Sequence, residues 1–151
     1  MELFFTLALA AGLARHCWTD MRELLLYDRV NAYLLSMGLL RACVMGLWQE
    51  AVCGLLALGV VMLLLYFLSR GGMGEGDVKL AAVLGCWLGW ERGLACLLLA
   101  FVGGAAVGLA LLACGRAQGK QALPFGPFLC AAGLACHLYG ARLVAWYWSL
   151  F

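Results

Sequence analysis

The sequence predicts an all-helical membrane protein, in which residues 1–151 form a single bundle of about six transmembrane helices. Three observations lead to this class: 66% of the 151 residues are hydrophobic, only 12% are charged, and the mean hydropathy is +0.98. A soluble domain of this length could not bury so much apolar surface, because small proteins keep a large fraction of their surface exposed. The composition therefore excludes a soluble globular enzyme and a disordered chain. The net charge of +2, without any basic run, also excludes a nucleic-acid binder.

Apolar stretches give the first expected spans, since crossing a bilayer takes about 20 apolar residues. Residues 51–69 and 93–115 carry no charge and meet this length outright. Residues 2–19 make another span, which we expect to be retained because it has neither a basic n-region nor a small-residue cleavage site. Residues 30–48 make the next, although Arg41 interrupts them.

Two further spans are expected. A helix begins near Pro127, because proline is tolerated in the first turn of a helix. It runs to about Trp148, with Arg142 snorkelling near its end. The stretch from Asp77 to Trp90 is only about 21 Å long if helical and has polar residues on both sides, so we expect a sixth, shallow span there. The absence of any internal repeat or long linker in the sequence predicts one compact bundle.

The distribution of basic residues predicts the orientation of the bundle. The connections after the first, third and fifth spans hold seven of the ten Lys and Arg residues, and the remaining three are Arg41, Arg92 and Arg142. Because cytoplasmic loops carry the excess of positive charge, we expect these connections to face the cytoplasm. The prediction depends on the shallow span, since without it Arg116 and Lys120 would move to the outer face.

The eight cysteines form no CxxC pair. Most of them lie within apolar stretches, where a thiol behaves as a small hydrophobic group. We therefore expect packing residues and neither a zinc site nor a disulfide framework. No metal ion or other cofactor is expected.

Carboxylates are the strongest candidates for chemistry in so apolar a chain. Two carboxylates at close range cannot easily both ionise, so they share a proton. The ionised one can take a proton from water, and the protonated one can polarise a carbonyl and later protonate a leaving amine. Five of the eight acidic residues fall in the first two expected cytoplasmic connections, which the topology brings to one membrane face: Asp20, Glu23, Asp28, Glu75 and Asp77.

The second of these connections is rich in glycine, with four glycines among residues 71–76. Each glycine costs about 1 kcal/mol relative to alanine in a helix, so we expect a flexible backbone that another chain can approach closely. A plainer interpretation is that Asp77 only caps the next helix and that Lys79 anchors it at the membrane interface. The plainer interpretation of the first connection is a solvated loop in which Asp and Arg neutralise each other.

Three segments resemble the type IV prepilin peptidases. Residues 72–80, Gly-Met-Gly-Glu-Gly-Asp-Val-Lys-Leu, resemble the family's GxGD motif in its GMGxGDxKL form, and residues 81–90 continue the likeness. Residues 124–129, Pro-Phe-Gly-Pro-Phe-Leu, resemble the PFGPF element that opens a late membrane helix. Residues 20–31 resemble the first aspartate region, in which a second Asp follows eight residues after the first. The resemblance spans about residues 14–135.

The resemblance implies a membrane-embedded aspartic endopeptidase of the bacterial cytoplasmic membrane. Its substrates would be prepilins or pseudopilins, whose basic leader is removed after a glycine at the cytoplasmic face. The residues carried over by position are a catalytic pair, two glycines that shape the loop presenting the second aspartate, and a lysine that positions this loop or tunes that aspartate: Asp20, Asp77, Gly74, Gly76 and Lys79.

This sequence departs from the family pattern in two ways. Tyr27 stands where many members carry proline before the second Asp, so the local turn is expected to differ. Many members also have an N-terminal domain with paired CxxC motifs, which methylates the processed pilin from S-adenosylmethionine. The sequence contains no such motif, so we expect peptidase activity without methyltransferase activity.

Several alternatives stay open. Asp28 competes with Asp20 as the partner of Asp77, because both lie in the same connection. A small transporter or channel subunit could use Asp20 and Asp77 as ion ligands, since broken, glycine-rich backbone at membrane boundaries also suits ion sites. A non-catalytic assembly factor that retains the fold is a third class.

Overall fold

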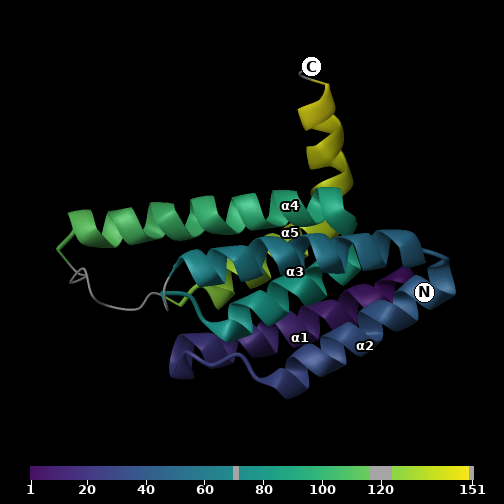
Figure 1. Cartoon of the computed structure of the whole chain (residues 1–151), viewed down its shortest axis with the longest axis horizontal. Coiled ribbons are helices and arrows are strands. Elements are labelled where there is room, and N and C mark those ends of the chain that lie inside the picture. Colours follow the sequence, from purple (N-terminus) through teal and green to yellow (C-terminus); the bar gives the residue numbers. More distant parts are fainter. Residues whose placement is uncertain (70–71, 116–123, 150–151) are drawn as a thin grey trace.

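A computed structural model describes residues 1–69, 72–115 and 124–149 (Figure 1). These residues form five α-helices and no strand, so the predicted all-helical class is confirmed. The helices are α1 (Glu2–Glu23), α2 (Asp28–Met45), α3 (Trp48–Leu68), α4 (Glu75–Ala113) and α5 (Gly126–Trp148).

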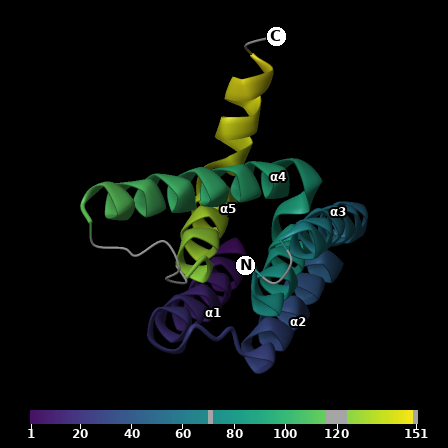
Figure 2. The same ribbon diagram turned by 60° about the vertical axis from the view of Figure 1, so that its left-hand side comes forward.

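The helices run alternately in opposite directions, so their termini gather at two ends of the molecule (Figure 1 and Figure 2). One end, formed by residues 20–28, 72–77 and 124–126, is called the carboxylate end. The other, formed by residues 1–6, 45–50 and 87–92, is called the distal end. The two acidic connections therefore lie together at the carboxylate end, as the sequence predicts.

α4 turns sharply at Gly89, whose φ of 77° and ψ of 178° are not helical. This conformation is accessible almost only to glycine. The first arm of α4, residues 75–88, lies within the bundle, and the second arm, residues 90–113, returns across it towards the carboxylate end (Figure 1). The predicted shallow span and the span that follows it are therefore the two arms of a single helical element.

The count of about six spans is not confirmed. Among the described residues, three helices are long and apolar enough to cross a membrane, namely α3, α4 and α5. The two expected spans at 2–19 and 30–48 correspond to α1 and α2, which bury polar side chains such as His16 and Arg41 in their length. Large apolar side chains cover much of the outer surface, which suits helices that face hydrocarbon.

All five helices contribute buried side chains to one apolar core. Trp87 is only 1% exposed, and its Nε1 donates a hydrogen bond of 2.9 Å to the carbonyl of Leu34. α3 and α4 approach each other closely through Gly54 and Gly85, because a methyl group on either would overlap the backbone of the other. Small residues at such crossings let membrane helices pack backbone to backbone. This packing fixes the first arm of α4, which begins at the carboxylate end.

The distal end is held by ion pairs. Arg41 is 8% exposed, its Nη2 lies 3.3 Å from Oε1 of Glu2, and its Nη1 donates to the Trp87 carbonyl at 3.3 Å. Nη2 of Arg92 lies 3.6 Å from Oε2 of Glu50, which joins α4 to α3. The charge that interrupts the second apolar stretch of the sequence is therefore part of an interhelical contact.

Candidate active site

Asp20 lies in the last turns of α1 and is 6% exposed. Its Oδ2 accepts a hydrogen bond of 2.9 Å from the backbone N–H of Gly126, the first residue of α5. The first N–H groups of a helix lack partners within the helix and favour a negative group. A Cβ atom at Gly126 would lie 2.6 Å from this oxygen, so only glycine permits the contact.

Asp77 lies in the first turn of α4 and is 8% exposed. The N-cap of this helix is Gly74, and the N–H of Asp77 donates to the Gly74 carbonyl at 3.2 Å. Asp77 is therefore the third residue of the helix, and Gly74, not Asp77, occupies the N-cap position. The Asp77 carboxyl reaches back to the Gly74 backbone, as in a capping box. The helix also begins earlier than the run of glycines suggests, since it includes Glu75 and Gly76.

The two loop glycines have different packing requirements. A Cβ at Gly74 would lie 3.4 Å from Oδ2 of Asp77, which is an ordinary van der Waals distance. A Cβ at Gly76 would lie 2.7 Å from Cβ of Leu26. The close approach expected at the glycine-rich segment is therefore made at Gly76 by the connection between α1 and α2, which brings that connection against the start of α4.

The carboxyl groups of Asp20 and Asp77 are close enough to interact electrostatically. The ion pairs of the described residues involve neither carboxyl group, and the same residues contain no cluster of ligands that could hold a metal ion. The site is therefore a pair of buried carboxyl groups with like charge, for which sharing one proton avoids two adjacent buried charges.

The environment of Asp20 opposes its ionisation. Burial raises the pKa of Asp20 above its usual value, and the hydrogen bond from the Gly126 N–H partly reverses this shift because it favours the charged form. A buried carboxyl with a raised pKa can hold a proton closer to neutral pH than an exposed one. The pair can therefore supply both a proton donor and a proton acceptor.

Asp28 and Lys79 lie outside this pair. Nζ of Lys79 is 2.7 Å from Oδ1 of Asp28, and the two side chains are 50% and 73% exposed. Lys79 follows Asp77 by two residues, so the two side chains leave different faces of α4. The structure thus brings Asp20, and not Asp28, to Asp77, and it pairs the lysine with the competing aspartate.

Sequence reasoning missed Gly126, although residues 124–129 were singled out as a motif. A glycine between two prolines at a helix start is the available signal, because it marks a backbone position where a side chain is not tolerated.

Cys130 also lies near the carboxyl pair, one turn after Gly126. It is 4% exposed and is close enough to both carboxyl groups to interact with them electrostatically. All eight cysteines are free thiols.

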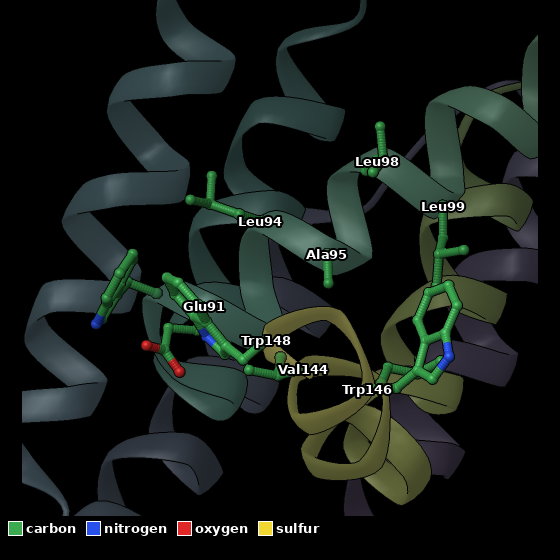
Figure 3. A pocket seen from close by; sticks show the side chains of 10 residues that line it. Glu91, Leu94, Ala95, Leu98, Leu99, Val144, Trp146 and Trp148 are labelled. Carbon is green, nitrogen blue, oxygen red and sulfur yellow. The ribbon is translucent and has the colours of Figure 1, made fainter. Parts of the chain in front are cut away.

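A cavity of about 430 Å³ opens elsewhere, between the second arm of α4 and α5 (Figure 3). Its lining is apolar apart from Glu91, and it includes Trp146 and Trp148. It begins beside the distal end and contains neither aspartate of the pair. This cavity therefore offers apolar surface and not the chemistry of the carboxylate end.

Comparison with known proteins assigns the chain to a family. Residues 7–109 match the sequence model of the type IV leader peptidase family, a range that covers more than half of the chain and contains both aspartates. The chain belongs to the type IV leader peptidase family. The predicted resemblance is thereby confirmed.

Several relatives bear the name prepilin leader peptidase/N-methyltransferase. The relative from Burkholderia pseudomallei strain K96243 is 42% identical in an alignment of 144 positions, and the alignment covers 87% of this chain and 45% of the relative. The relative from Aeromonas hydrophila is 36% identical over 139 aligned positions, with 87% of this chain and 48% of the relative covered. The relative from Stutzerimonas stutzeri is 37% identical over 149 aligned positions, with 93% of this chain and 51% of the relative covered. The chain spans about half the length of these curated relatives. No solved structure matches it.

Proposed function

We propose that this member of the type IV leader peptidase family is an aspartic endopeptidase that cleaves prepilin-type leader peptides. Asp20 and Asp77 are its catalytic pair. The observation that carries the proposal is that α1 and α4 bring two buried carboxyl groups together at one end of the bundle. The printed names of the relatives support the leader peptide as substrate.

The two aspartates are assigned different roles by their surroundings. The N–H of Gly126 stabilises the ionised form of Asp20, so Asp20 is the general base that takes a proton from the attacking water. Asp77 holds the shared proton, because its burial and the neighbouring Asp20 carboxyl oppose a charge there more than its backbone hydrogen bond with Gly74 favours one. It donates this proton towards the oxygen of the scissile carbonyl. The proton taken from water then passes to the leaving amine, which completes the hydrolysis.

The substrate is a prepilin or pseudopilin whose basic leader is cut after a glycine. The apolar outer surface places the bundle in a bilayer. The carboxylate end faces the cytoplasm of a bacterial cell, on the basis of the basic residues in the connections at that end.

Substitution of each aspartate by asparagine tests the catalytic pair. In membranes that contain a prepilin-type substrate, Asp20→Asn and Asp77→Asn should each lower the rate of leader removal at least about 100-fold, the range lost with a general acid or base. Mass spectrometry of the substrate measures the removal. Both variants should insert and fold, because asparagine has nearly the same size.

Asp28→Asn is the matched control, because this exposed carboxylate is paired with Lys79 and should not be needed for cleavage. Cleavage at the normal rate by Asp77→Asn would show that Asp77 is not a catalytic residue. Failure of the wild-type protein to cleave the substrate would favour the non-catalytic assembly factor. An inactive Asp28→Asn together with an active Asp20→Asn would show that Asp28 is the catalytic partner.

A further inference from the structure

A buried polar pair lies one helical turn from Asp20. His16 is 0% exposed and Asn31 is 5% exposed. Nε2 of His16 and Oδ1 of Asn31 are 3.1 Å apart, and this contact joins α1 to α2. Because His16 precedes Asp20 by four residues, the two side chains leave the same face of α1. The α1–α2 contact is therefore adjacent in space to the candidate active site.

The contact between His16 and Asn31 stabilises the fold less than apolar side chains at these positions would. Nδ1 of His16 and Nδ2 of Asn31 are buried and have no hydrogen-bond partner among the described residues. Leaving a buried polar group unpaired costs roughly 1–3 kcal/mol, whereas two apolar side chains would join α1 and α2 without this cost. What the pair adds over apolar packing is direction, because a hydrogen bond fixes the rotation of one helix relative to its neighbour.

The rotation of α1 decides where the carboxyl group of Asp20 points. On the side of α5, Asp20 is held by the N–H of Gly126 at 2.9 Å. On the side of α2, α1 is held by the contact between His16 and Asn31. We infer that His16 and Asn31 are positioning residues that hold Asp20 in register with Asp77, an inference that rests on the proposed peptidase function. Neither residue makes a hydrogen bond or ion pair with the carboxyl pair among the described interactions, so they act through the orientation of α1.

Loss of this contact should lower the turnover rate and leave substrate binding unchanged. A misplacement of about 1 Å at a catalytic group can cost about 100-fold in rate. We therefore expect His16→Leu and Asn31→Leu each to lower kcat by about 10- to 100-fold, with KM within about 2-fold of the wild type. The double variant should lose no more than the more damaged single variant, since both substitutions remove the same contact.

His137→Leu is a matched control. Nε2 of His137 lies 3.1 Å from Oγ1 of Thr6, which is also an interhelical contact of α1. Thr6 precedes Asp20 by 14 residues, about 21 Å along the helix. The control removes the same type of contact far from the carboxyl pair, and kcat should stay within about 2-fold of the wild type.

The experiment measures kcat and KM for leader removal by the full chain in detergent micelles, together with the thermal unfolding temperature. His16→Gln should recover most of the lost kcat, because its side-chain amide can donate a hydrogen bond to Asn31 as the imidazole does. His16→Leu should unfold at the wild-type temperature or higher, which a residue needed only for stability would not allow. If His16→Leu fails to insert, Asn31→Leu and His16→Gln give the same measurement.

Three results would overturn the inference: an unchanged kcat in folded His16→Leu and Asn31→Leu, an equal kcat loss in His137→Leu, or losses that add in the double variant. In each of these, cleavage by the wild-type protein and its loss in Asp77→Asn leave the proposed function standing. A wild-type protein that leaves prepilin-type substrates uncut overturns the proposed function, and the inference with it.

Discussion

The two ends of the bundle differ in whether their buried ionisable side chains have ion-pair partners. At the distal end, Arg41 is 8% exposed and has both a carboxylate, Glu2, and a backbone carbonyl as partners. At the carboxylate end, Asp20 and Asp77 are buried to the same degree, but no ion pair of the described residues involves either of them. Arg41 and the two aspartates are therefore equally buried, but among the described residues only Arg41 has an oppositely charged partner.

The difference separates a structural role from a chemical one. Arg41 is paired with a carboxylate and a carbonyl, although its Nε has no hydrogen-bond partner among the described residues. A guanidinium stays charged and has no tendency to exchange protons at neutral pH. Two neighbouring buried carboxyl groups retain one proton between them and can transfer it, which is why perturbed acids concentrate at active sites. We expect substitutions at the carboxylate end to change the rate, and substitutions at the distal end to change the stability.

The largest effect that sharpens this comparison is expected from Gly126→Ala. A Cβ at this position would lie 2.6 Å from Oδ2 of Asp20, so the carboxyl group must move or the backbone hydrogen bond must break. We expect the rate of leader removal to fall about 100-fold, as for a misplaced catalytic group, with little change in KM. Steady-state kinetics of the purified protein measures this loss.

Gly103→Ala is the control for Gly126→Ala. A Cβ at Gly103 would lie 3.6 Å from Phe128, an ordinary contact, so the variant should keep the wild-type rate. A fully active Gly126→Ala would show that the contact between α5 and Asp20 does not set the geometry of the site.

The meeting of the two aspartates could be predicted from the sequence, because it depends on local features. The apolar stretches give the helices, their alternation gives the two ends, and the motif of residues 72–80 marks Asp77. With so few charges in the chain, Asp20 and Asp28 were the remaining candidates for its partner. The family resemblance favours Asp20, with Asp28 as the alternative, and the structure buries Asp20 and exposes Asp28.

The features that sequence could not predict join distant residues or depend on one backbone angle. The contact between Asp20 and Gly126 joins positions 106 apart, and the pairs Arg41–Glu2 and Lys79–Asp28 join positions 39 and 51 apart. Hydropathy reports only the composition of a short window, so it treats Arg41 as an interruption. Hydropathy also gives no information on the φ of Gly89. This backbone angle turns the helix, so that the two expected spans are the two arms of α4.

A smaller effect, on stability, is expected from Arg41→Ala at the distal end. The substitution leaves the Trp87 carbonyl without its side-chain donor and removes the packed stem of the arginine. We expect a loss of roughly 2 kcal/mol in the free energy of unfolding, since Glu2 is half-exposed and can be solvated. The rate per folded molecule should stay within about 3-fold of the wild type.

Thermal unfolding in detergent and the cleavage assay together test Arg41→Ala. Arg41→Met restores the packing without the hydrogen bonds, so it separates the two contributions to stability. If folded Arg41→Ala lost as much rate as Gly126→Ala, the division of roles between the two ends would be wrong.

The smallest expected effect concerns the pH dependence of stability. Burial raises the pKa of Asp20 in the folded protein, so folding favours the protonated form of this carboxyl. Its stabilising contribution is complete below the unfolded pKa of about 3.9 and is lost as the pH rises through the raised folded pKa. Asparagine does not ionise, so Asp20→Asn should gain stability relative to the wild type over this rise in pH.

Unfolding temperatures of the wild type and Asp20→Asn between about pH 4 and pH 8 measure this difference in stability. A difference that shrinks with rising pH would mean that the Gly126 hydrogen bond outweighs burial, and that Asp20 is held as a stable anion like the paired charges of the distal end.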